Sequence, residues 1–538
     1  MNTNSLNTAD ANHLTLKGKH LDFEILGGIN SENVQSLRVM LITKCKRATH
    51  RNNIDLYNQD QLQAYKNKVV EITGVHRDAT SLDFEHLITQ LEEYKLELRH
   101  RPTKPAKKAI QLSDEQRDEA IQILKQSDLL NIINELIGKT GIVGNETNRM
   151  ILFLTYLTRR TRNGLHAVIH SKFNSLQSKM AEVIPDEEKF TISHISENAL
   201  FYFDEEELQN KVVLVEDTIS NRKSLMPLIG FQKSNVITKT TVTKNEYAEL
   251  VTVQKHVKGN VALSISTREE HAFTKHGLLS FVLSEDSGSI QDEKVLLYQR
   301  MQSAGHVSEF TEKKIAQQIQ NIQRALEPVT VINPYAMEVE LPEQIRNKQI
   351  TNLHYLRFIE IITFLKQYQR EKKVNEDTGE IYIETSIEDI KEANELLAEV
   401  LLNRSDKITK TSRIYLEQLK SFIAASKSSG ESFTLLEVSI ALQVPKTTLK
   451  RYLKVWVDFG LVRAIQCKGQ AHQFELVDVN EYKELQVSIS KTLESNVRSI
   501  QSIHKKLNDK SETRSNQNKN GAVKRLENRK LVNVKPNK

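Results

Sequence analysis

The chain has 538 residues, of which 38% are hydrophobic and 27% are charged, and its formal net charge is +6. This length exceeds one ordinary hydrophobic core and predicts several domains, and the composition is that of a globular protein with a polar surface. No stretch is apolar enough for a transmembrane helix, and the first residues lack the apolar core of a signal peptide. We therefore expect a cytoplasmic protein without a membrane partner.

Cysteines are few, and positive charge gathers at one end of the chain. Cys45 and Cys467 are the two cysteines, too few for a four-ligand zinc site or a disulfide framework, so no metal site is predicted. From Lys505 to Lys538 there are eleven Lys or Arg residues and three Asp or Glu residues, a net charge of +8 that leaves +6 − 8 = −2 for the rest. Basicity is therefore local and does not mark the whole chain as nucleic-acid binding.

The N-terminal part predicts a small α+β unit. Apolar and polar residues alternate in HLDFEIL (residues 20–26) and SLRVMLITKC (residues 36–45), as in half-buried strands. Helical spacing of apolar residues follows at residues 59–74 and 83–100. RPTKPAKKA (residues 101–109) combines two prolines with four basic residues and predicts a linker.

Residues 112–161 predict a helical block, after which strand-like segments alternate with helices or loops. These segments are LHAVIH (residues 165–170), KVVLVED (211–217), NVALSIS (260–266) and LLSFVL (278–283). The alternation predicts a mainly parallel sheet covered by helices.

KVVLVED is typical of the strand that delivers carboxylates to the nucleotide-bound magnesium of a P-loop ATPase. Glu216 and Asp217 are the candidate acids. The phosphate loop would follow the strand at 165–170, where Lys172, Asn174 and Ser175 stand, but residues 171–185 contain no glycine. Without glycine the backbone does not readily adopt the positive φ angles that a phosphate cradle needs. We therefore expect a degenerate phosphate loop whose acids and lysine are vestigial.

The segment from residue 433 to 477 predicts a winged helix-turn-helix. Thr434 and Glu437 form a capping box, and a helix from Lys446 to Phe459 ends at Gly460. Its inward side is expected to carry Leu449, Leu453, Val455 and Trp456, and two strands would form a wing around residues 468–469. The residues expected to contact DNA are Lys446, Thr447, Thr448, Lys450, Arg451, Lys454 and Lys468.

Two alternatives remain open for this C-terminal part. The winged unit could serve protein contacts or act as an internal brace. The basic tail after residue 505 could add sequence-independent affinity for DNA or only raise solubility.

Three segments carry a resemblance to a known family. GNETNRMILFLTYLTRR (residues 144–160), ISENALFYFDEEELQNKVVLVED (195–217) and NPYAMEVELPEQIRNKQITNLHYLRFIEIITFLKQYQR (333–370) are similar to segments of mobile-element, phage-type bacterial DNA primase–helicases. The resemblance covers most of residues 14–480 and includes the winged unit. It implies a P-loop ATPase-like core in a protein of DNA replication.

The sequence departs from that family in two ways. The zinc finger and the primase catalytic domain have no counterpart among these residues, and the glycine-rich phosphate loop aligns with HSKFNS (residues 170–175), which has no glycine. The resemblance therefore implies the ATPase-like and winged-helix parts alone, with a degenerate P-loop.

These patterns predict a DNA-binding replication accessory of a mobile element or phage-like system, whose degenerate core acts as a scaffold. Alternatives are an active, DNA-stimulated ATPase of the helicase type using Lys172, or a winged-helix replication initiator or transcription regulator. The expected partners are DNA and a separate primase or helicase subunit; a homo-oligomer is left open, and no cofactor is expected unless ATP and magnesium bind under the ATPase alternative.

The expected fold class is a multidomain α/β and α protein with a P-loop-like, mainly parallel core and helical regions. The expected parts are an α+β unit (14–100), a linker (101–111), a degenerate ATPase-like domain (112–330), a helical domain with a hairpin (331–425), the winged helix-turn-helix (431–480) and a helix followed by a disordered basic tail (481–538).

Overall fold

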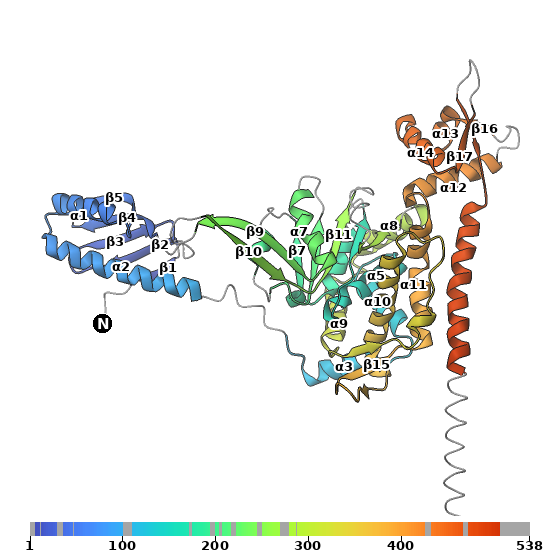
Figure 1. Cartoon of the computed structure of the whole chain (residues 1–538), viewed down its shortest axis with the longest axis horizontal. Helices are drawn as coiled ribbons and strands as arrows, with labels where there is room; N and C mark the ends of the chain where they lie inside the picture. The colour runs from blue at the N-terminus through green and yellow to red at the C-terminus, as the bar shows by residue number, and fades with distance from the viewer. Residues whose placement is uncertain are drawn as a thin grey trace, which may run out of the picture. The chain divides into compact units, whose positions relative to one another are not determined.

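The computed structural model of the chain describes residues 6–10, 12–29, 36–46, 48–100, 110–171, 175–193, 199–203, 207–216, 222–244, 250–268, 279–286, 288–425, 432–465 and 472–505. The chain forms two compact units (Figure 1). Residues 1–108 with 240–254 make the first unit, and residues 109–239 with 255–538 make the second. Among the described helices, none combines the length and the apolarity needed to cross a membrane.

The first unit is an antiparallel sheet of five strands with two helices. Consecutive strands pair in chain order, and alternate side chains such as Leu14, Phe23 and Leu41 are buried, which confirms the alternating pattern. The sheet begins at Asn7, before the expected boundary at Leu14. Its elements are β1 (Asn7–Asp10), β2 (His13–Lys17), β3 (Asp22–Leu26), β4 (Arg38–Cys45), β5 (Ala48–Asp55), α1 (Gln59–Thr73) and α2 (Arg77–His100).

The second unit contains a parallel sheet of five strands in the order β12-β6-β11-β8-β7. Every neighbouring pair in it is parallel, so the predicted parallel sheet is confirmed. The strands are β6 (Ala167–His170), β7 (Lys189–Ile192), β8 (Lys211–Glu216), β11 (Val261–Thr267) and β12 (Phe281–Ser284). The first strand in chain order thus lies between the last two.

Both faces of this sheet are covered. Side chains such as Ile169 and Leu214 belong to one large apolar cluster with the helices on that face. Their sequence neighbours, among them Val213, pack on the other face with Leu228 and Phe231 of α7 (Arg222–Lys233). Burial on both faces explains why these strands are continuously apolar in the sequence.

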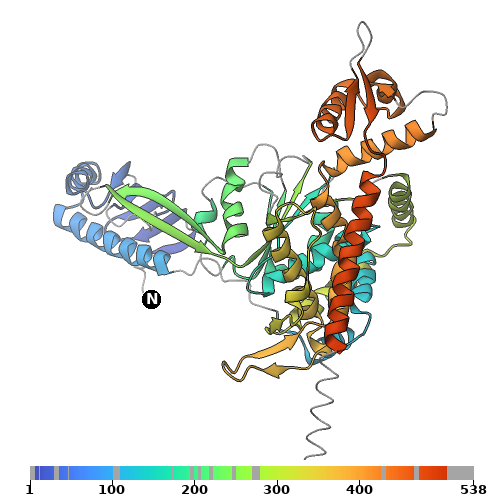
Figure 2. The same cartoon turned by 45° about the vertical axis from the view of Figure 1, so that its right-hand side comes forward.

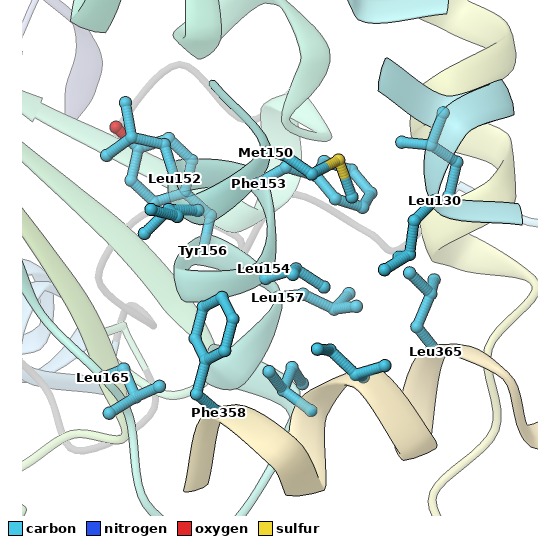
Figure 3. Packing of buried hydrophobic residues seen from close by; sticks show 14 of the residues in the cluster. Leu130, Met150, Leu152, Phe153, Leu154, Tyr156, Leu157, Leu165, Phe358 and Leu365 are labelled. Carbon is cyan, nitrogen blue, oxygen red and sulfur yellow. The ribbon is translucent and has the colours of Figure 1, made fainter. Parts of the chain in front are cut away.

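Helix α5 (Glu146–Leu157) lies at the centre of the larger cluster, and its residues 149–157 are all buried. Figure 3 shows its side chains, including Phe153 and Leu157, gathered toward Phe358 and Leu365 of α10 and Leu130 of α4. The helices around it are α3 (Asp114–Leu124), α4 (Leu129–Gly138), α6 (Ser175–Met180), α8 (Ser289–Ser303), α9 (Glu309–Arg324), α10 (Lys348–Leu365) and α11 (Ile387–Ser405).

Two smaller sheets precede the C-terminal part of the chain. β9 (Val236–Lys244) and β10 (Leu250–Lys258) form a two-stranded ribbon, of which residues 240–254 belong to the first unit. β13 (Thr330–Ile332), β15 (Ile381–Glu384) and β14 (Lys373–Val374) form a sheet beside α10. β14 and β15 pair antiparallel, as the strands of a hairpin do, and β13, from earlier in the chain, pairs with β15 in parallel.

Residues 408–476 form a separate apolar core, here called the C-terminal cluster, around Trp456. It contains α12 (Lys410–Ala425), α13 (Leu435–Ala441), α14 (Lys446–Asp458) and an antiparallel sheet in the order β16-β18-β17 (Ser432–Thr434, Gln473–Leu476 and Val462–Ile465). Leu416 and Leu419 of α12 are fully buried in this cluster, so α12 packs with the elements that follow it.

A helix over residues 481–505 follows the C-terminal cluster. It packs against the larger cluster through Ile489, Leu493 and Ile500, and the side chain of Asn496 bonds to both the backbone N–H and the carbonyl of Glu340. In Figures 1 and 2 this helix, drawn in red-orange, runs alongside the helices of the second unit. The residues after 505 lie outside the described part of the chain.

Candidate nucleic-acid interface and the carboxyl edge of the parallel sheet

The carboxyl ends of parallel strands meet at one edge of a sheet, which is where ligands bind in open α/β folds. At this edge β6 ends at His170, β8 at Glu216 and β12 at Ser284. Glu216 is half-buried and lies in register with Ser266 of β11. Asp217, the second candidate acid, lies outside the described residues.

The connection from β6 to α6 stands where a phosphate loop would lie. Residues 171–185, which follow β6, contain no glycine, whereas the phosphate-loop pattern has two glycines among its eight residues. Ser171 is buried, and its backbone N–H donates to the carbonyl of Thr267 at 3.0 Å. Lys172, Asn174 and the side chain of Ser175 lie outside the described residues.

Two carboxylates that follow β12 occupy this edge. The Glu285 carboxylate accepts a hydrogen bond from the backbone N–H of Leu176, in the first turn of α6, at 2.9 Å. Asp286 accepts from the backbone N–H of Asn145 at 3.0 Å, and its own N–H donates to the Asn145 side chain at 2.7 Å. Backbone N–H groups at a helix start are the donors that bind phosphate in nucleotide sites. At α6 the chain's own carboxylate already holds one of them.

Buried polar side chains form a row of hydrogen bonds in the interior beside this edge. Gln177 donates to the carbonyl of Val215 at 3.1 Å and accepts from the Ser264 hydroxyl at 2.9 Å. The Tyr156 hydroxyl lies 2.9 Å from the same serine oxygen, and burial raises the pKa of Tyr156 above its ordinary value. These contacts fix α5, α6, β8 and β11 to one another.

Helix α14 has the two-sided form that the sequence predicted. Leu449, Leu453 and Trp456 are buried, whereas Val455, also expected inward, is half-buried. The Trp456 indole N–H donates to the Ser412 hydroxyl of α12 at 2.9 Å.

The ends of α13 and α14 also agree with the sequence. The capping box of α13 joins Thr434 and Glu437, and Gly460 has a φ of 69° just after α14. Glycine adopts that left-handed conformation more readily than residues with a side chain, so the helix ends where the sequence indicated.

The outer side of α14 is basic. Lys446, Lys450, Arg451 and Lys454 are all exposed, and Thr447 is exposed among them, while Thr448 is half-buried. Among the described residues, none lies close enough to these four cations to form an ion pair with them. The Arg451 guanidinium lies 5.4 Å from the centre of the Tyr452 ring.

The strands β17 and β18 pair from Val462 with Leu476 to Ile465 with Gln473. They flank residues 466–472, where the sequence predicted a wing. Lys468 lies outside the described residues. Six of the seven residues expected to contact DNA therefore lie together on α14, and the seventh, Lys468, is not described.

Arg413 of α12 is the centre of a buried ion network that sequence reasoning missed. Its guanidinium donates two hydrogen bonds to Asp406, at 2.6 and 2.7 Å, and also pairs with Glu481 at the start of the C-terminal helix. Burial alone lowers the pKa of Arg413, but the hydrogen bonds that it donates to Asp406 and Glu481 outweigh burial and raise the pKa. Lys420 joins the network at 3.2 Å from Glu481.

An open cleft lies beside this network. It has a volume of about 470 Å³ and is lined by residues of α11, α12 and the C-terminal helix, including Glu399, Glu417 and Tyr482. The Arg413 guanidinium stacks 4.5 Å from the centre of the Tyr482 ring. The charged side chains that line the cleft form ion pairs with one another, among them Lys410 with Glu399 and Arg413 with Glu417. We therefore interpret the cleft as part of the contact between the C-terminal cluster and the helix that follows it.

Two histidines are buried beside β11 and β12. His354 lies 3.0 Å from the Arg404 guanidinium, which must donate to it, so His354 is neutral. Burial and the nearby Arg404 lower the pKa of His354 to about 2. Burial likewise lowers the pKa of His166 to about 3, and its Nδ1 accepts from the Leu263 backbone N–H at 3.2 Å.

Comparison with known proteins adds no relative. The sequence matches no known protein family, and no curated protein is significantly similar to it. Within the described ranges, no three His, Cys, Asp or Glu side chains gather as a metal site would require.

Proposed function

We propose that this protein binds DNA through the outer side of α14. The single observation that carries the proposal is that Lys446, Lys450, Arg451 and Lys454 are exposed on one side of a helix whose other side is buried. These four cations have no ion-pair partner among the described residues. DNA phosphates are the ligand that such a cluster favours.

The surrounding elements support a winged helix-turn-helix. β16, α13, α14, β17 and β18 follow one another in the order of that motif, with α14 in the place of the recognition helix. No side chain caps the start of α14, where Pro445 occupies the N-cap, so its first N–H groups suit a phosphate. Thr447 lies exposed among the lysines and is the residue placed to contact base edges.

The parallel-sheet core is proposed as a scaffold. The lack of glycine in residues 171–185 and the carboxylate of Glu285 at the start of α6 favour a core that binds no nucleoside triphosphate. The resemblance of residues 144–160, 195–217 and 333–370 to primase–helicases supports a role in the replication of a mobile or phage-like element. On this proposal the protein works in the cytoplasm beside a separate primase or helicase subunit.

A binding titration tests the DNA proposal. The full chain is titrated onto labelled duplex DNA and onto single-stranded DNA of the same sequence, with fluorescence anisotropy as the readout. We expect Lys450→Ala with Arg451→Ala to weaken binding about tenfold at ~0.1 M salt and to lower the salt slope by about 2, one unit for each lost phosphate contact. The matched control removes two exposed lysines of the C-terminal helix, Lys483→Ala with Lys491→Ala.

The control variant has the same change in net charge and should bind as the unchanged protein does. Equal losses in both variants would show that total charge alone drives binding, and unchanged affinity in the α14 variant would remove α14 from the interface. A competition experiment with duplexes of unrelated sequence then distinguishes a replication accessory, which binds all of them alike, from a sequence-specific initiator or regulator. A preference of roughly a thousandfold or more for one sequence would indicate the latter.

A further inference from the structure

Helix α8 lies at the outside of the second unit (Figures 1 and 2), and the structure describes all of its residues. None of its side chains is buried. Gln291, Val295 and Tyr298 are half-buried and recur at four- and three-residue steps, so they mark the side that faces the rest of the unit. Gln291 donates to the carbonyl of Val143 at 2.8 Å, and the Tyr298 hydroxyl donates to Glu312 at 2.5 Å.

A second, exposed side of α8 carries large apolar residues. Ile290 is 73% exposed, Leu297 58% and Met301 41%, and at steps of seven and four residues they form one stripe, with Leu296 beside it. An amphipathic helix of a globular protein normally turns such a stripe inward. Here it faces solvent, so it is suited to a contact with another molecule.

The charges that flank the stripe indicate which molecule fits. Glu293 and Arg300 lie on the same side of α8, two turns apart, and neither has an ion-pair partner within the described residues. A second α8, laid antiparallel about a twofold axis between Leu296 and Leu297, brings each Glu293 opposite an Arg300 of the other copy. The same arrangement sets the two apolar stripes against each other, because an interface with this symmetry is self-complementary.

We propose that two copies of this chain associate through an antiparallel pair of α8 helices. A contact of four helical turns is smaller than the ~1,200–2,000 Å² that stable interfaces bury, so we expect a weak dimer that dissociates on dilution. The proposal does not depend on DNA binding and is tested without DNA.

Sedimentation velocity on the full chain, from ~1 to ~100 µM, covers the range in which so small an interface associates. The unchanged protein should shift from monomer to dimer with rising concentration. Leu297→Glu should abolish the shift, because it buries two carboxylates at the twofold axis. Glu293→Arg and Arg300→Glu should each weaken association at least tenfold, since each places like charges opposite one another.

The double change, Glu293→Arg with Arg300→Glu, restores opposite charges across the axis and should restore the dimer. Val487→Glu, at a site 50% exposed on the C-terminal helix, is the matched control and should leave association unchanged. Circular dichroism confirms that each variant is folded. A chain that stays monomeric, a dimer that survives Leu297→Glu, or a double change that fails to restore association would each overturn the proposal.

Discussion

The carboxylate of Glu285 accepts a hydrogen bond from the backbone N–H of Leu176, which lies 109 residues earlier in the chain. This contact joins the residue after β12 to the first turn of α6. A carboxylate at a helix start is stabilised by the partial positive charge there, as a phosphate would be. The chain's own side chain therefore accepts a hydrogen bond from one of the backbone N–H groups at the start of α6.

The first prediction concerns ATP. We expect ATP with magnesium to leave the melting temperature unchanged, because Glu285 holds the start of α6 and residues 171–174 provide no glycine for a phosphate cradle. A ligand that binds the native state and is present at 100 times its Kd would add about 2.7 kcal/mol to the free energy of unfolding and raise the melting temperature by several degrees. Differential scanning fluorimetry measures this directly.

Duplex DNA serves as the positive control in that experiment, since a DNA-binding protein should be stabilised by it. A rise in melting temperature with ATP, lost in Lys172→Ala, would instead support the ATPase alternative.

The second prediction concerns Arg413. In Arg413→Met the buried Asp406 loses both guanidinium hydrogen bonds, and Glu481 loses Arg413 and keeps only Lys420 of its two cationic partners in the network. Breaking a buried ion pair from one side costs about 3–5 kcal/mol, because an uncompensated charge stays behind. Trp456 is the only tryptophan and is fully buried in the C-terminal cluster. Its fluorescence during urea unfolding therefore reports the stability of this cluster.

Arg498→Met is the matched control for Arg413. Arg498 is 78% exposed and pairs with Glu494 one helical turn away, so its loss should cost less than about 0.5 kcal/mol. Equal unfolding midpoints for the two variants would show that the Arg413 network contributes no more than a surface pair.

The third prediction concerns acid. His354 and His166 are neutral in the folded chain because burial lowers the pKa of each, to about 2 and about 3. In the unfolded chain each takes up a proton below a pKa of about 6.5, so their contribution to stability is complete above that pH and declines as the pH falls. Between pH 7.5 and pH 5.5 each histidine should lower the free energy of unfolding by on the order of 1.4 kcal/mol.

His354→Gln keeps an acceptor for Arg404 but does not titrate, so urea unfolding followed by circular dichroism should show a smaller loss at pH 5.5. The corresponding change at the exposed His306 should leave the stability at both pH values as it was. A His354 variant with the full acid sensitivity of the unchanged protein would contradict the assignment.

The sequence by itself determined the features that depend on near neighbours in the chain. The alternation around Phe23 and Leu41 predicted the antiparallel strands, because side chains on a strand point to opposite faces. The capping box of Thr434 with Glu437 and the left-handed Gly460 marked helix ends correctly, since a cap is completed within one turn. The basic and apolar sides of α14 followed in the same way from the helical period.

Only the tertiary structure decided the features that join distant residues. β6 pairs with β11 and β12 across about a hundred residues, Glu285 caps α6, and Arg413 meets Glu481, which lies 68 residues away. No local pattern records such pairs, because they form only when packing of the whole unit offsets the entropy of closing long loops. For the same reason the exposure of the apolar side of α8 could not be predicted from the spacing of its apolar residues. The spacing predicts a helix with an apolar side, and only the fold shows that this side is turned to solvent.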